Sequence, residues 1–393
     1  MTQNTCRTID VDRHVLEPIE MWPDYLDKRF HAHLPRLTPR EDASRTWEDR
    51  FASLGEHALS HTPPAMTVDG RPIIDIPELA AIIAMEQASH RLSAVTPTLT
   101  GEHHLLAMDA GHIDIGVILP SYALYLAYND HFDAALTRAF AQAYNRWILD
   151  YCAVSPRRMR PAALIQRQDP GLMKEDLEAA LRQGFRSVVL RPNPVWGRTI
   201  SDPGLLPFFD ACAEESVPVL FHEGSHGQVT SAGADRYRTR FGQHSCSHPM
   251  EAMMALLSLI EGGVLERFPK LRVAFLEAGC SWLPHWLWRL DHLAYQHMRA
   301  EVAGRVTKPP SLYVKAQCWF SFECDEYLLS ETFEAVGHDR FILGSDYPHV
   351  DHALNALDGL ARHLGGLSPQ QRRGILWDNP AALLGIPMDD LDT

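Results

Sequence analysis

The chain has 393 residues, and 50 Asp and Glu against 36 Lys and Arg give a formal net charge of −14. An acidic chain with a pI near 5.8 lacks the positive charge that binds a phosphate backbone or an anionic lipid surface. We therefore expect neither nucleic acid nor a membrane as partner. The length exceeds the roughly 250 residues of a typical (β/α)8 barrel, so it is compatible with two modest domains or one large domain with insertions.

The first ten residues, the short apolar runs and the cysteines lead us to expect a cytoplasmic protein. Residues 1–10 contain one Arg and no apolar run of the signal-peptide kind, and no later stretch approaches about 18 uninterrupted apolar residues. The seven cysteines are widely spaced, and none forms a Cys-x-x-Cys pair. We expect reduced thiols rather than a disulfide framework.

Short strand-like runs alternate with helical segments along the chain. The predicted strands are 8–14, 113–119, 160–165, 187–190, 217–222, 271–276, 312–316 and 340–343. The predicted helices are 132–151, 174–182, 205–215, 250–268, 282–295 and 326–336. Eight strands with helices between them predict an α/β fold, a (β/α)8 TIM barrel with a parallel sheet.

Two segments do not follow this repeat. Residues 31–111 mix Pro, His and charged residues after the first strand, and residues 223–249 are rich in Gly, Ser and His after the fifth. Both follow the carboxyl end of a barrel strand, where the active-site loops of such barrels lie. We therefore expect one domain over 1–393, with long loop insertions after strands 1 and 5 that cap the barrel mouth.

Acidic and histidine residues gather at the predicted strand ends. Asp12 and His14 lie two apart at the end of the first strand, so alternation directs both side chains to one face. His222 closes the fifth strand, Glu277 closes the sixth, and Asp346 follows the eighth. Imidazole and carboxylate groups together are typical ligands of zinc, manganese or iron. The pattern predicts a metal site at this rim.

The motifs that carry these residues resemble those of the amidohydrolase superfamily, in its amidohydrolase-related branch, which includes aminocarboxymuconate-semialdehyde decarboxylase. The matching segments are DVDRHVLEP at 10–18, VPVLFHE at 217–223, RFPKLRVAFLEAG at 267–279, LGSDYPH at 343–349 and WDNPA at 377–381. The resemblance extends from residue 9 to about 386, and it implies a (β/α)8 barrel with a divalent metal at its carboxyl rim.

Carried over to this sequence, the resemblance implies metal ligands at Asp12, His14, His222 and Asp346. Many members have His-x-His where this chain has Asp12-Arg-His14, and the decarboxylases have a catalytic histidine where this chain has Glu277. Members with two metals bridge them with a lysine after strand four, and residues 187–192 contain none. We expect one divalent ion, with zinc favoured and manganese or iron as alternatives.

Other residues are candidates for catalysis and substrate binding. Glu277 and His248 could donate or accept a proton, and Asp346 could serve as a base. Arg191 and Arg198 could grip a substrate carboxylate through their forked donors, although a surface salt bridge is an equal interpretation of Arg198. His349, three residues after Asp346, could contact substrate or support the metal ligand.

The first functional hypothesis is a non-oxidative decarboxylase of a small carboxylated compound, cyclic or aromatic in character. The alternative is a metal-dependent hydrolase of a C–N, C–O or C–C bond, in which a bound water attacks. A second alternative is a barrel that has lost catalysis and serves as a binding module. By analogy with the family, a homodimer is a further expectation.

Overall fold

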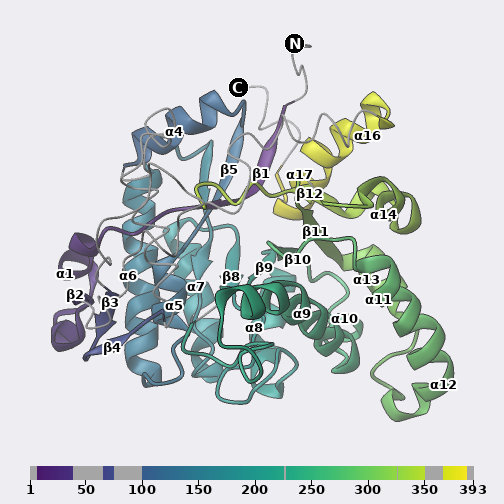
Figure 1. The fold of residues 1–393 in the computed structure, drawn as a ribbon, viewed down its shortest axis with the longest axis horizontal. Coiled ribbons are helices and arrows are strands. Elements are labelled where there is room, and N and C mark those ends of the chain that lie inside the picture. The colour runs from purple at the N-terminus through teal and green to yellow at the C-terminus, as the bar shows by residue number, and fades with distance from the viewer. Residues whose placement is uncertain are drawn as a thin grey trace.

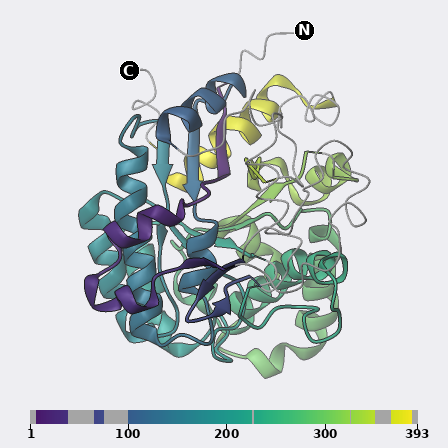
Figure 2. The same ribbon diagram turned by 60° about the vertical axis from the view of Figure 1, so that its left-hand side comes forward.

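The computed structural model describes residues 7–38, 65–74, 100–224, 227–324, 326–349 and 366–386. Parallel strands occupy the centre, and helices surround them in both views (Figures 1 and 2). The central strands are β1 (Ile9–His14), β5 (Ile115–Leu119), β6 (Met159–Pro161), β7 (Ala163–Leu164), β8 (Val188–Leu190), β9 (Val219–His222), β10 (Val273–Leu276), β11 (Cys318–Phe322) and β12 (Phe341–Leu343). Over the described ranges, no helix is both long and apolar enough to cross a bilayer.

These strands follow one another around a ring. The ladders run β1-β5-β6 and β12-β11-β10-β9-β8-β7, and every pair in them is parallel. Only Ala162 separates β6 from β7, and its N–H donates to the Ile118 carbonyl at 3.0 Å. At the other junction, the His14 N–H donates to the Tyr347 carbonyl at 2.6 Å. The predicted (β/α)8 barrel is therefore confirmed.

Helices cover the outside of the ring. They are α1 (Trp22–Tyr25), α4 (Gly101–Ala110), α5 (Tyr122–Ala127), α6 (Ala134–Cys152), α7 (Met173–Gln183), α8 (Leu206–Glu214), α9 (Arg240–Glu261), α10 (Val264–Arg267), α11 (Leu283–Trp288), α12 (Gln296–Met298), α13 (Pro310–Gln317), α14 (Leu329–Val336), α16 (Pro369–Arg373) and α17 (Asn379–Leu384). Local signals set their ends: the Asp133 side chain accepts the Leu136 N–H at the start of α6, and Gly184 ends α7 with φ 106°.

One predicted strand is wrong. Residues 312–316 lie in helix α13, and the seventh strand is β11, which starts at Cys318. Pro310 occupies the first turn of α13, a position that favours a helix, and Tyr313 and Val314 form its buried face. A short apolar run fits a buried helix face as well as a strand, so periodicity alone could not separate the two.

The helix predicted at 250–268 also has different bounds. Helix α9 begins ten residues earlier, at Arg240, after Thr239 accepts the Gly242 N–H with its side chain. It ends at Glu261, and Gly263, with φ 74°, separates it from α10. The last ten residues of the 223–249 segment are therefore helical rather than loop.

The two insertions meet each other. The described part of 31–111 contains α4 and a small antiparallel sheet of β2 (Arg36–Thr38), β3 (Ala65–Val68) and β4 (Arg71–Pro72). Just after β4, Ile74 forms an antiparallel bridge with Gly227, in the segment that follows β9. Much of the first insertion lies outside the described residues, and its role as a cap stays a prediction.

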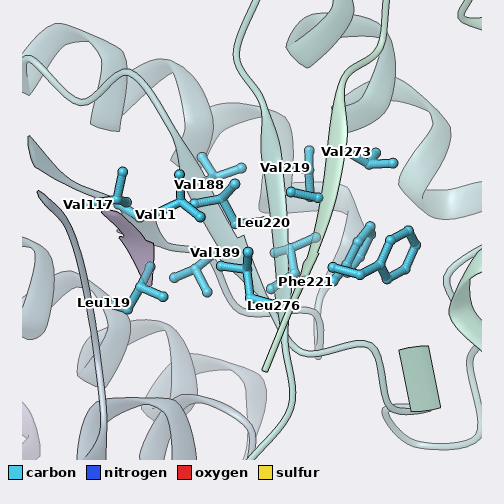
Figure 3. Packing of buried hydrophobic residues seen from close by; sticks show 14 of the residues in the cluster. Val11, Val117, Leu119, Val188, Val189, Val219, Leu220, Phe221, Val273 and Leu276 are labelled. Carbon is cyan, nitrogen blue, oxygen red and sulfur yellow. The ribbon is translucent and has the colours of Figure 1, made fainter. Parts of the chain in front are cut away.

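Aliphatic and aromatic side chains fill the barrel and its contacts with the helices. Figure 3 shows a part of this core, with side chains from β1, β5, β8, β9 and β10 packed against one another. The labelled members are Val11, Val117, Leu119, Val188, Val189, Val219, Leu220, Phe221, Val273 and Leu276. Each is at most 2% exposed, and burial of one such side chain stabilises the fold by about 1.5–3 kcal/mol.

A buried polar cluster accompanies this core where β1 meets the chain after β12. The Asp10 carboxylate accepts hydrogen bonds from the Ser345 N–H and from Arg13 Nη1, each at 3.0 Å. The Arg13 guanidinium lies over the Tyr347 ring, 4.5 Å from its centroid. Gly116 gives Arg13 room, because a Cβ there would lie 2.8 Å from its Cδ.

We predict that Asp10→Asn destabilises the protein by about 3 kcal/mol, because it removes the carboxylate that pairs with the buried Arg13 charge. Urea unfolding followed by tryptophan fluorescence measures the change. Asp210→Asn, at an exposed position of α8, is the matched control and should alter the free energy of unfolding by less than about 0.5 kcal/mol. Equal effects of the two variants would contradict this account of the junction.

Candidate metal centre

Three strands deliver four side chains to one point at the carboxyl rim. Asp12 and His14 come from the end of β1, His222 ends β9, and Asp346 follows β12. Each offers a ligand atom within 4.8 Å of the other three, and each residue is at most 2% exposed. The register of β1 against β5 shifts between Asp10 and Arg13, a local irregularity that often aims side chains at a site.

The four groups are close enough to share one cation. The Nε2 atoms of His14 and His222 are 2.9 Å apart. Asp12 Oδ1 lies 3.2 Å from the first of these atoms and 3.5 Å from the second. Asp346 Oδ1 lies 3.2 Å from His14 Nε2. Two imidazoles and two carboxylates form a compact, buried donor set.

Neighbouring groups orient these donors. His14 Nδ1 lies 2.9 Å from the Pro120 carbonyl oxygen, so this nitrogen donates and Nε2 turns its lone pair to the centre. His349 Nδ1 lies 2.8 Å from Asp346 Oδ1, and its Nε2 lies 3.1 Å from the Ser121 hydroxyl. The structure therefore places His349 against Asp346, and a role of His349 in supporting the ligand or in binding substrate stays a prediction.

The donor set fits a divalent metal ion. Among the described residues, Asp12 Oδ1 is buried and accepts no hydrogen bond. Burial, with help from the nearby His349 and His222, lowers the pKa of His14 to about 3, so this ring is neutral. Burial opposes a charge on His222, yet the Asp12 carboxylate raises the pKa of that ring to about 9. A cation would replace this proton, and the two carboxylates would neutralise a divalent ion.

Close backbone packing fixes the position of Asp12. A Cβ on Gly344, which follows β12, would lie 2.9 Å from the Asp12 Cβ and 3.0 Å from the Ser321 Cβ. Glycine therefore allows β12 to approach β1 and β11 at the rim. Asp346 has φ 50°, a left-handed conformation that non-glycine residues rarely adopt and that costs about 1–3 kcal/mol.

Glu277 borders the metal centre. Its Oε2 lies 3.2 Å from His222 Nε2 and 3.5 Å from His248 Nδ1. Its φ of 47° is again left-handed, and its N–H donates to the Ser321 hydroxyl at 3.0 Å. The structure therefore brings the predicted Glu277 and His248 together beside the predicted ligands.

The interactions continue from His248 to a buried ion pair. His248 Nε2 lies 3.5 Å from Glu223 Oε2, and Arg191 Nη2 donates to Glu223 Oε1 at 2.8 Å. Burial opposes a charge on Glu223, but the Arg191 guanidinium holds its pKa at about 2. Glu223 is a residue that the sequence reasoning missed, although its position directly after His222 at a strand end was a signal.

The two predicted arginines differ in their surroundings. Arg191 is fully buried within this network. Arg198 Nη2 donates to the Gln168 carbonyl at 2.6 Å, and its guanidinium lies over the Trp196 ring. The contacts described for Arg198 thus serve the loops after β7 and β8, and substrate binding by either arginine stays a prediction.

Comparison with known proteins places the chain in a family. The family model described as amidohydrolase matches residues 9–386. The chain belongs to the amidohydrolase family. Among solved structures, this amidohydrolase is similar to an amidohydrolase from Mycobacterium avium subsp. paratuberculosis, with a TM-score of 0.75, 22% identity, and coverage of 97% of this chain and 100% of that one. It is also similar to a 5-carboxyvanillate decarboxylase from Novosphingobium aromaticivorans solved with manganese, with a TM-score of 0.69, 18% identity and coverage of 98% and 99%. These likenesses show the fold.

The alignments with curated relatives cover a smaller part of the chain. A 2-amino-3-carboxymuconate-6-semialdehyde decarboxylase of Dictyostelium discoideum is 27% identical over 211 residues, 53% of this chain and 56% of the relative. A gamma-resorcylate decarboxylase of a Polaromonas strain is 21% identical over 272 residues, 65% of this chain and 78% of the relative. For the first relative, and for its counterpart from Caenorhabditis elegans, the chain spans about half the relative's length.

We predict that the purified protein binds one divalent ion per chain. His222→Ala and Asp346→Ala should each weaken binding about 100-fold or more, because each removes a buried donor. Metal analysis by plasma mass spectrometry after dialysis against a weak chelator measures the loss. His297→Ala, at an exposed histidine of α12, is the control and should retain the ion. Full metal content in both ligand variants would refute the assignment and favour the non-catalytic binding module.

Proposed function

We propose that this amidohydrolase is a metal-dependent, non-oxidative decarboxylase of a small carboxylated compound, cyclic or aromatic in character. The observation that carries the proposal is the placement of two titratable groups, Glu277 and His248, directly beside a buried donor set for a divalent ion. The names of the curated relatives and of the manganese-containing structural neighbour support this reaction class.

Asp12, His14, His222 and Asp346 would hold the ion. We favour zinc, with manganese as the alternative that the structural neighbour suggests. When bound, the ion supplies electrostatic stabilisation for negative charge that develops on substrate oxygens. The Pro120 carbonyl orients His14, and His349 orients Asp346.

The chain's own residues would manage the proton. Decarboxylation breaks the bond between the carboxylate carbon and the substrate, carbon dioxide leaves, and the electron pair stays on the substrate carbon. That carbon then takes a proton, which we assign to His248 or to Glu277. A proton from solvent restores the donor, so each turnover consumes one proton and releases one carbon dioxide.

Glu277 adds a negative charge where the related decarboxylases carry histidine. The substrate is itself an anion, so a third carboxylate next to Asp12 and Asp346 disfavours its approach. A protonated His248 between Glu277 and Glu223 would offset this charge. We therefore favour His248 as the final proton donor, with Glu277 as its partner.

Hydrolysis at the same centre is the second candidate. It is favoured by Glu277 Oε2, which lies 3.2 Å from His222 Nε2 and could act as a general base beside the metal. In that reaction an oxygen atom from water enters the product, whereas decarboxylation introduces only hydrogen. The two reactions therefore leave different isotopes in the product.

We predict that a screen of aromatic and unsaturated carboxylic acids with the metal-loaded enzyme releases carbon dioxide from at least one compound. In deuterium oxide the product should contain one deuterium on the carbon that lost the carboxylate. Mass spectrometry in ¹⁸O-labelled water provides the opposing test. Stoichiometric ¹⁸O in the product, without carbon dioxide release, would establish hydrolysis and overturn the decarboxylase proposal.

We predict that Glu277→Gln lowers kcat about 100-fold or more while the metal content is unchanged, because the substitution removes a proton-transfer group and retains size. Steady-state kinetics and metal analysis of the same preparation measure both quantities. Glu178→Gln, at an exposed position of α7, should leave kcat unaltered. A kcat within twofold of wild type in Glu277→Gln would exclude Glu277 from proton transfer.

A further inference from the structure

Glu223 has two oxygens in different surroundings. Its Oε1 accepts three hydrogen bonds, from Arg191 Nη2 at 2.8 Å, Asn193 Nδ2 at 2.9 Å and the Ser231 hydroxyl at 3.1 Å. Its Oε2 is buried, accepts no hydrogen bond from the described residues, and lies 3.5 Å from His248 Nε2. One oxygen therefore fixes the carboxylate in place, and the other is directed at the histidine.

His248 lies between carboxylates that follow two neighbouring strands. Its Nε2 faces Glu223 at the end of β9, and its Nδ1 lies 3.5 Å from Glu277 Oε2 at the end of β10. The ring comes from helix α9, is 7% exposed, and contacts the His244 ring edge-on at a centroid distance of 4.8 Å. Both distances exceed the usual range of N–H···O hydrogen bonds, and contacts of this kind often shorten when substrate binds.

Arg191 is already hydrogen-bonded to Glu223. Its Nη2 donates to Glu223, its Nε donates to Asn193 Oδ1 at 3.1 Å, and the guanidinium lies 5.7 Å from the centroid of the Tyr125 ring. The Arg191–Glu223 pair is buried and formally neutral. An arginine already paired in this way contributes less attraction to a substrate anion than a free one.

We propose that Glu223 is a positioning residue that fixes the ring orientation of His248, and that Arg191 acts on the reaction by holding Glu223. The expected effect on kcat rests on the proposed function. The orienting contact itself rests on the described distances. The arrangement follows a general design in which a third group orients the imidazole that moves the proton. It departs from the simpler expectation that Arg191 grips the substrate.

The test compares wild type with Glu223→Gln, which keeps the size of the side chain and removes its charge, in the metal-loaded enzyme. We expect kcat to fall about 10–100-fold while KM changes less than about twofold, because an orienting contact is lost and no substrate contact is. His248→Gln should lower kcat at least as much. In the double variant the second substitution should cause no further loss, because both act through one ring. Independent, multiplicative losses would overturn the proposal.

A spectroscopic readout makes the test independent of activity. In ¹⁵N-histidine-labelled protein, the His248 ring signals are assigned by their absence in His248→Gln, and they should shift in Glu223→Gln without any substrate. If wild type decarboxylates nothing but these signals shift, the proposed function fails and the positioning contact stands. Unchanged His248 signals in a folded, metal-containing Glu223→Gln protein would overturn the positioning role.

Two further variants complete the test. One replaces Glu223→Gln if that protein does not fold, and the other tests whether Arg191 binds substrate. Glu223→Asp keeps the charge and should retain more activity than Glu223→Gln, so it serves if the latter does not fold. Arg191→Lys removes the forked donors and should lower kcat with KM within about twofold. A KM raised tenfold with unchanged kcat would instead identify Arg191 as a substrate grip and overturn its part of the proposal.

Discussion

Barrel closure between β1 and the chain after β12 is the constraint on which the site depends. The Asp346 N–H donates to the Asp12 carbonyl at 2.9 Å, and the His14 N–H donates to the Tyr347 carbonyl. These backbone contacts close the ring and set the proposed metal ligands from the two ends of the chain side by side. The hydrogen bonds of buried Asp10 and the close approach that glycine allows at position 344 stabilise the same junction. Fold and metal site are therefore built by the same contacts.

Buried charges are balanced against one another at the carboxyl rim. Asp12, Asp346, Glu277 and Glu223 bring negative charge to one rim. A divalent ion bound by Asp12 and Asp346 would balance the first two, and the buried Arg191 guanidinium pairs with the last. His248 lies between the remaining carboxylates, where a proton on its ring would be stabilised. Each buried carboxylate at the rim thus lies beside a group that can carry positive charge.

Much of this could be predicted from the sequence, because strand ends follow simple rules. Alternation in β1 placed Asp12 and His14 on one face, and the strand ends at His222, Glu277 and Asp346 met at one rim. The seventh strand was misplaced because an apolar run after two prolines suits a helix face equally well.

The pairing of charges could not be predicted from the sequence. Arg191 and Glu223 directly follow the neighbouring strands β8 and β9, and only the three-dimensional register reveals that they bind each other. His248 lies on α9, which begins ten residues earlier than its apolar pattern indicated, so the end of the second insertion belongs to a helix. Such contacts depend on which groups become neighbours after folding, and spacing along one chain does not contain that information.

The central claim is that one divalent ion joins the two ends of the barrel through Asp12, His14, His222 and Asp346. A crystal structure of the metal-loaded protein, with anomalous scattering at the absorption edge of the ion, tests it most directly. The account predicts a single anomalous peak about 2.0–2.3 Å from one atom of each of these side chains. A peak bound instead by Glu277 and His349, or an ion elsewhere in the chain, would contradict it.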